Sequence, residues 1–187
     1  FSAGGSYDDF ERRRVDLAVR RRSLHLARRL VDDMLAVAVP VVAAVNGPAV
    51  GLGCTVTTLC DIVFMADTAF LADTHVSVAL VAGDGGAVTW PAMTSILRAK
   101  QYLLTGDRVS ATEAVSLGLA NFVVPPDRLL DDALAYAHRL AAQPPQAVQQ
   151  TKAVLNQHLR ANATRALGFG LAAESQSHDT PEYAAAA

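Results

Sequence analysis

The chain has 187 residues, of which 51% are hydrophobic and 18% charged, and its formal net charge is -2. This length suits one domain with a substantial buried core. The near-zero charge argues against a nucleic-acid-binding protein, and the apolar share argues against disorder. The apolar run at 37–45 contains Pro40 and is too short for a bilayer crossing, which takes about 20 apolar residues. We therefore expect no nucleic acid and no membrane among its partners.

The two cysteines, Cys54 and Cys60, lie six residues apart in one apolar segment. This spacing is typical of neither a disulfide framework nor a metal site, so we expect no metal and a reducing, cytoplasmic location. The chain begins with Phe1 rather than Met, and we expect that the gene product begins upstream of it.

The N-terminal region has the pattern of one long helix over 8–36. Apolar residues recur at helical spacing, with Leu17, Leu24 and Val31 seven residues apart. The arginines fall on the opposite face, which predicts a solvated surface rather than a nucleic-acid-binding patch. They occur in clusters at 12–14, 20–22 and 28–29.

A strand–turn–helix–strand pattern follows. The β-branched apolar run at 41–45 predicts a buried strand, and the glycine turn at 51–53 opens a short helix over 54–59. Further apolar runs predict strands at 61–66 and 69–72. Because a strand, a helix and a second strand form a βαβ unit, we expect a parallel sheet.

The second half of the chain has mainly helical patterns, separated by glycine and proline turns. Helices are expected at 87–93, 95–104, 111–117, 127–142 and 146–173, with a short strand at 121–124.

Two glycine-rich turns, at 2–5 and 51–53, each run into a predicted helix. The first N–H groups of a helix lack intrahelical acceptors and carry partial positive charge. Two such turns that face each other would form an oxyanion hole. The alternative is that the glycines only permit tight turns. Neither turn has the pattern of a phosphate-binding or dinucleotide-binding loop.

Several ordered motifs resemble the crotonase (enoyl-CoA hydratase/isomerase) superfamily. They are FSAGG at 1–5, PVVAAVNGPAVGLGC at 40–54, CDIV at 60–63 and LTGDRVSATEA at 104–114. The resemblance implies an α/β fold, a spiral of ββα and βαβ turns. Residues 1–125 would form this core and 126–187 a C-terminal helical region that assembles a homotrimer or hexamer. It also implies that the first strands of the spiral lie upstream of this chain.

The resemblance implies an acyl-CoA substrate whose thioester carbonyl accepts hydrogen bonds from the backbone N–H groups of Gly5 and Leu52. Ala3, Gly51 and Gly53 would lie beside the substrate. CoA would enter as part of the substrate, and no bound cofactor is expected.

The chain departs from the hydratase pattern at both catalytic positions. Where hydratases of this superfamily carry two glutamates, this chain has Thr55 and His75. Hydration needs a positioned acid and base, and Thr cannot act as a base near neutral pH. We therefore expect no standard two-glutamate hydration, and Thr55 to contact the substrate.

His75, Asp84 and Trp90 together resemble the β-diketone hydrolase branch of the superfamily. This implies that Asp84 orients His75, which activates water, and that Glu174 supplies a further carboxylate. Trp90 is either a pocket wall or a core residue. The alternative for His75 and Asp84 is a purely structural role, as a loop residue and a helix N-cap.

Three functions therefore remain open. The first is an enoyl-CoA hydratase/isomerase-like enzyme, a lyase or isomerase that stabilises an enolate. The second is a hydrolase that cleaves the C–C bond of a β-diketone, a β-dicarbonyl substrate, without CoA. The third is a non-catalytic scaffold that retains ligand affinity.

Overall fold

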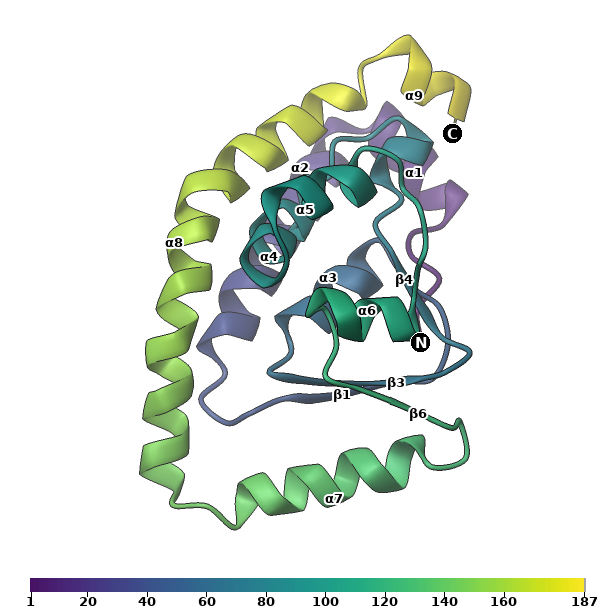
Figure 1. The fold of residues 1–187 in the computed structure, drawn as a ribbon. Coiled ribbons are helices and arrows are strands. Elements are labelled where there is room, and N and C mark those ends of the chain that lie inside the picture. Colours follow the sequence, from purple (N-terminus) through teal and green to yellow (C-terminus); the bar gives the residue numbers. More distant parts are fainter. Residues whose placement is uncertain (187) are drawn as a thin grey trace.

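A computed structural model describes residues 1–186 (Figure 1). The helices are α1 (Tyr7–Val15), α2 (Leu17–Ala36), α3 (Leu52–Leu59), α4 (Gly86–Met93), α5 (Ile96–Leu103), α6 (Ala111–Leu117), α7 (Leu129–Ala141), α8 (Pro145–Ser177) and α9 (Pro181–Ala186). The strands are β1 (Val42–Val45), β2 (Ala49–Val50), β3 (Ile62–Ala66), β4 (Phe70–Ala72), β5 (Val109–Ser110) and β6 (Phe122–Val124). A 3₁₀ turn covers His75–Val78.

The strands form two small sheets. One is parallel, in the order β1-β3-β6, with Val42 opposite Ile62. The expected βαβ unit is therefore confirmed as β1–α3–β3. The other sheet has the order β2-β4-β5, in which β2 and β4 are parallel and β5 is antiparallel. The two-residue strands β2 and β5 were not predicted, because two residues are too few to show a periodicity.

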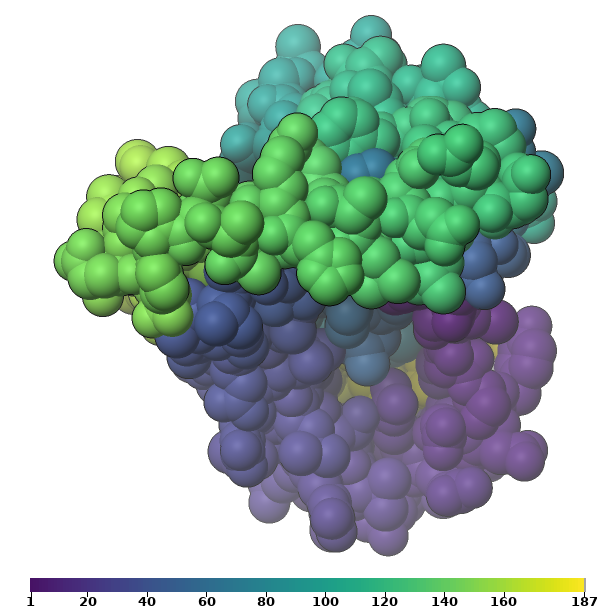
Figure 2. Space-filling model, turned by 90° about the horizontal axis from the view of Figure 1, so that it is seen from below, coloured from purple at the N-terminus to yellow at the C-terminus, as the bar shows by residue number. Residues whose placement is uncertain are grey.

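Helix α7 covers one face of the parallel sheet through aromatic contacts. Phe64 of β3 stacks on Phe122 of β6 with ring centroids 4.6 Å apart, and Tyr136 of α7 packs edge-on against Phe64 at 5.7 Å. Such pairs add about 0.5–1.5 kcal/mol beyond the area they bury. From below, α7 lies as a ridge across the molecule (Figure 2).

The single helix predicted over 8–36 is wrong, because the chain breaks at Asp16. This residue has extended dihedrals (φ -118, ψ 107), and its carboxylate accepts hydrogen bonds from the N–H groups of Ala18 and Val19. Asp is among the best N-cap residues, so it starts a new helix. The break separates α1 from α2.

The prediction that all the arginines are solvated is wrong for Arg20, which is only 5% exposed. Its guanidinium binds the carboxylate of Asp179 at 2.8 Å and donates to the carbonyls of Arg13, Arg14 and Ser175. The planar guanidinium of Arg20 has five N–H donors, enough to bind one carboxylate and three carbonyls at once. Arg20 thereby ties the α1–α2 junction to the end of α8.

Helix α8 runs along one side of the molecule and ends four residues beyond its predicted end (Figure 1). An apolar cluster joins α8 to α2, α3 and α4. It contains Val31, Leu35, Leu59, Val88, Ala163, Leu167 and Leu171. Within residues 1–186, no helix is both long enough and apolar enough to cross a membrane.

Candidate active site

The two glycine turns lie side by side. The N–H of Ser2 donates to the carbonyl of Pro48 at 2.8 Å, and the N–H of Val50 donates to the carbonyl of Ser2 at 2.9 Å. The first loop therefore runs along β2. A Cβ on Gly53 would lie 2.5 Å from the Cβ of Ser2, so only glycine permits this approach of α3 to the loop.

The second turn depends on a backbone conformation that only glycine adopts readily. Gly51 has φ 53 and ψ -121, and its N–H donates to the carbonyl of Ala72 at 2.9 Å. Leu52 is then the first residue of α3, where the N–H has no intrahelical acceptor. Within residues 1–186, neither this N–H nor that of Gly5 has a hydrogen-bond acceptor. Both residues line one cavity.

This cavity has a volume of about 900 Å³. Besides the two glycine turns, it is lined by residues of α1 and α2 and by His75, Asp84 and Glu174. Figure 2 shows a hollow between the purple N-terminal part of the chain and the blue-violet part of α2, with yellow atoms of the C-terminal part at its floor. Such a volume suits a small organic ligand.

His75 lies between two carboxylates. Its Nδ1 contacts Oδ1 of Asp73 at 2.5 Å, whereas its Nε2 lies 3.4 Å from Oδ2 of Asp84. The hydroxyl of Thr55 donates to Oδ1 of Asp84 at 3.1 Å. The shorter contact fixes the ring through Nδ1, and both His75 and Asp84 line the cavity.

The two carboxylates determine the charge of the imidazole. Burial by itself would lower the pKa of His75, but the charge of Asp84 and hydrogen bonds with both aspartates outweigh it. The pKa of His75 therefore lies well above its ordinary value, and the two aspartates favour the protonated imidazole. Burial opposes ionisation of Asp84, but the charge and hydrogen bond of His75 lower its pKa.

Glu174 approaches this group because α8 packs unusually close to the loop before α4. A Cβ on Gly83 would lie 2.4 Å from the carbonyl oxygen of Gly170, so this pair of glycines brings the backbones together. Glu174 lies one turn beyond Gly170, and its buried Oε2 has no hydrogen-bond partner within residues 1–186. Burial and the charge of Asp84 raise the pKa of Glu174 to about 7, although the positive charges of His75 and Arg13 act to lower it.

The sequence profile described as enoyl-CoA hydratase/isomerase matches residues 1–183. The chain belongs to this family. The crotonyl-CoA hydratase of Syntrophomonas wolfei is 35% identical over 142 residues, which are 73% of this chain and 55% of that protein. The putative enoyl-CoA hydratase/isomerase YngF of Bacillus subtilis is 31% identical over 84% of this chain and 59% of its own length. The chain thus spans about half the length of these relatives.

Solved structures confirm the crotonase fold. An enoyl-CoA hydratase/isomerase from Mycobacterium paratuberculosis has a TM-score of 0.95 and 47% identity, covering all of this chain and 74% of that one. A β-diketone hydrolase from the cyanobacterium Anabaena has a TM-score of 0.83 and 26% identity, covering 89% of this chain and 66% of that one.

In this member of the family, most of the residues predicted for the site line the cavity of about 900 Å³. They are Ala3, Gly5, Gly51, Leu52, Gly53, His75, Asp84 and Glu174. Thr55 does not line the cavity; it is almost completely buried, and its hydroxyl donates to Asp84. Trp90 does not line the cavity; it is fully buried in the core, 5.8 Å from the ring of Tyr102.

Two further residues belong to the site, although their sequence patterns assigned them no role. Asp73 is the Nδ1 partner of His75, and the signal for it was its position directly after the strand β4. Arg13 lines the cavity from α1, but its place in an arginine cluster indicated a solvated side chain. Among residues 1–186, no group of three His, Cys, Asp or Glu side chains is arranged to hold a metal ion.

Proposed function

We propose that this protein is a hydrolase that cleaves the C–C bond between the carbonyls of a β-diketone. The observation that carries the proposal is the imidazole of His75, held by Asp73 and Asp84 in the cavity that contains the Gly5 and Leu52 amides. The structural similarity to a β-diketone hydrolase supports it. Thr55 stands where two-glutamate hydratases carry a glutamate, which argues against hydration.

The reaction proceeds in two steps. Water adds to one carbonyl carbon while the other carbonyl oxygen accepts hydrogen bonds from the amides of Gly5 and Leu52. The C–C bond then breaks, which gives a carboxylic acid and an enolate whose oxygen remains on these amides. Fixed donors of this kind stabilise the developing negative charge, and each contributes about 10²–10³-fold in rate. Protonation of the enolate carbon yields the ketone.

The buried acids and the imidazole supply the proton transfers. Glu174, with a pKa of about 7, is partly ionised at neutral pH and takes the proton from water, a step that the resemblance assigned to His75; the raised pKa of His75 makes the imidazole a poorer base. The protonated form of His75, which the two aspartates favour, gives its Nε2 proton to the enolate carbon. Glu174 then passes its proton back to His75, which restores both groups. Asp73 holds the ring, and Asp84 stabilises its charge.

The second candidate is a CoA-dependent lyase or isomerase of the hydratase type. The names of the sequence relatives favour it, because they include crotonyl-CoA hydratase and short-chain-enoyl-CoA hydratase. The amides of Gly5 and Leu52 would then bind a thioester carbonyl, with CoA as part of the substrate.

A substrate screen separates these functions. The full-length protein is incubated with a mixture of acyl-CoA thioesters and a mixture of cyclic and linear β-diketones, and products are identified by mass spectrometry. We expect acid products from β-diketones in the absence of CoA. Turnover of CoA thioesters alone would refute the hydrolase. Binding of either class without turnover would indicate the non-catalytic scaffold.

We predict that the full-length protein hydrates crotonyl-CoA poorly. Thr55 and His75 occupy the positions of the two glutamates, and loss of a positioned acid or base lowers the rate by roughly 10²–10⁴-fold. The crotonyl-CoA hydratase of Syntrophomonas wolfei, assayed in parallel by loss of the enoyl absorbance, is the reference. Comparable turnover by the two proteins would contradict the prediction.

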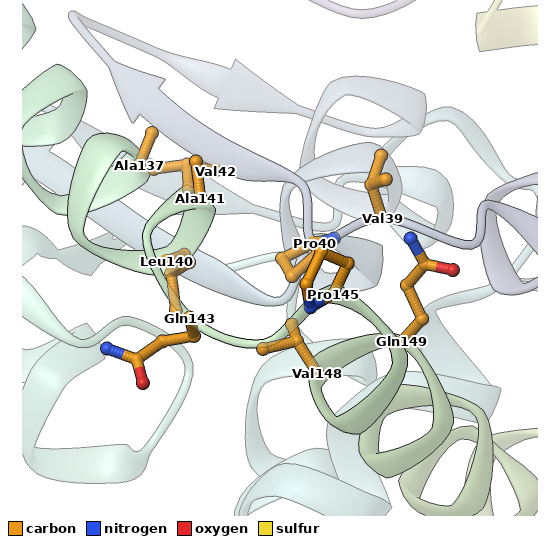
Figure 3. A pocket seen from close by; sticks show the side chains of 10 residues that line it. All are labelled: Val39, Pro40, Val42, Ala137, Leu140, Ala141, Gln143, Pro145, Val148 and Gln149. Carbon is orange, nitrogen blue, oxygen red and sulfur yellow. The ribbon is translucent and has the colours of Figure 1, made fainter.

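We also propose a homotrimer or hexamer assembled through the C-terminal helices. Apolar side chains of α8 are exposed, including Leu155 and Phe169, the latter 80% exposed. An apolar groove of about 250 Å³ lies between α7, the start of α8 and the segment before β1 (Figure 3). An apolar groove next to exposed apolar side chains is typical of protein interaction sites.

Light scattering of the full-length protein at micromolar concentration should give the mass of a trimer or hexamer. Leu155→Glu should shift the mass toward the monomer, because it buries a charge in the interface. Gln157→Glu, on an exposed position of the same helix, is the control and should not. A monomeric wild-type protein would overturn the proposal.

A further inference from the structure

Arg13 lines the cavity but has no direct role in the proposed reaction. The face of α1 that carries Tyr7, Phe10 and Arg13 lines the cavity. Residues three apart on a helix share a face, so this spacing directs Arg13 inward with the two aromatic rings. Among the described residues that line the cavity, it is the one Lys or Arg side chain.

Arg12 and Arg14, which flank Arg13, and Arg20 have acidic partners, whereas Arg13 has none among residues 1–186. Arg12 pairs with Asp9 at 3.8 Å, Arg14 with Glu11 at 2.7 Å and Arg20 with Asp179 at 2.8 Å. Asp9 lies one helical turn before Arg13, but its carboxylate is engaged by Arg12 and by the hydroxyl of Ser6. Arg13 is half-buried, and its guanidinium, with no acidic partner among residues 1–186, is available to a ligand.

The α2 lining of the cavity is mainly apolar, with Ser23 as its polar residue. Helix α2 contributes Leu24, Leu26, Ala27 and Leu30. A ligand that fills the cavity thus meets the Gly5 and Leu52 amides, an apolar wall and one guanidinium. Arg recognises a carboxylate through two parallel hydrogen bonds, which gives both affinity and orientation.

We infer that Arg13 binds a carboxylate at the non-reacting end of the substrate, so that the enzyme acts on carbonyl compounds that carry a second, anionic group. The inference rests on the proposed function for the reacting end of the molecule. The anionic end is recognised in the same way whether the reacting carbonyl belongs to a diketone or to another carbonyl compound.

Succinylacetone, a β-diketone that ends in a carboxylate, tests this inference against its neutral methyl ester. Calorimetry should show that the full-length protein binds the acid about 10–100-fold more tightly than the ester, the range expected for charge-assisted hydrogen bonds. Arg13→Gln should bind both compounds equally and weakly. Arg12→Gln, which changes the adjacent solvent-exposed arginine, is the matched control and should retain the preference for the acid.

A second variant separates recognition from charge balance. If Arg13 served only to offset the charges of Asp84 and Glu174, its replacement would lower kcat for acid and ester alike and leave their affinity ratio unchanged. Arg13→Lys keeps the charge but loses the planar fork, so we expect an intermediate preference. This variant replaces Arg13→Gln if that protein fails to fold.

The outcomes distinguish this inference from the proposed function. A preference for the acid without cleavage of either compound would support the role of Arg13 and refute the hydrolase. Cleavage of both compounds with equal affinity would support the hydrolase and refute the role of Arg13. Equal affinity in the wild-type protein, no binding of either compound, or an undiminished preference in Arg13→Gln would overturn the role of Arg13.

Discussion

His75→Ala should lower kcat/KM roughly 10²–10⁴-fold on the substrate found by the screen, because His75 moves the proton that the reaction requires. Asp84→Asn should have an effect of similar size, since the carboxylate near Nε2 stabilises the imidazolium. The double variant should lose little more than either single variant, because residues that act as a unit are strongly non-additive. Steady-state kinetics on the four proteins provides the test.

Asp73→Asn extends this experiment to the Nδ1 side of the ring. An amide at this position can still accept the Nδ1–H hydrogen bond but carries no negative charge, so it stabilises the protonated imidazole less than the carboxylate does. We expect kcat to fall, and the pH profile to shift toward a lower pKa for His75. His25→Ala, at an exposed position of α2, is the control. Full activity of His75→Ala would exclude the proposed mechanism.

Gly53→Ala should reduce activity by about 10²–10³-fold, the effect of losing one oxyanion donor. The new Cβ would lie 2.5 Å from Cβ and 2.7 Å from Oγ of Ser2, so α3 must move away from the first loop. That movement displaces the N–H of Leu52 relative to that of Gly5. The loss should appear mainly in kcat, because the donors act on charge that develops in the transition state.

A second substitution tests this explanation directly. Ser2→Gly removes the two side-chain atoms that the new Cβ would meet, and leaves the Ser2 carbonyl oxygen at 3.4 Å. Activity should therefore recover substantially in Gly53→Ala/Ser2→Gly, while Ser2→Gly alone should have a small effect. Melting temperatures of all three variants exclude unfolding as the cause. Normal activity of Gly53→Ala would show that the two turns do not act together.

Local sequence was sufficient for the elements whose patterns are strong. The β-branched run before Asn46, the glycine turn and the following apolar runs predicted β1, α3 and β3, and their order required a parallel arrangement. The same segments carried the family resemblance that the sequence profile confirms. The helix break at Asp16 was missed because the apolar periodicity continues across it, and only the capping hydrogen bonds show where α2 begins.

The sequence by itself determined the fold family, the two glycine turns and the absence of glutamate at Thr55 and His75. Only the tertiary structure decided which groups surround the imidazole. Asp73 and Asp84 lie on opposite sides of His75 because a strand end and a separate loop converge there.

The charge state of the site was likewise decided by tertiary contacts. Glu174 has a pKa of about 7 because the Gly83–Gly170 contact buries it near Asp84, more than eighty residues away in sequence. The positions of Trp90 in the core and of Arg13 in the cavity were also decided by which segments pack together. Burial and electrostatic fields depend on which segments pack together, and the composition of a single segment does not contain that information.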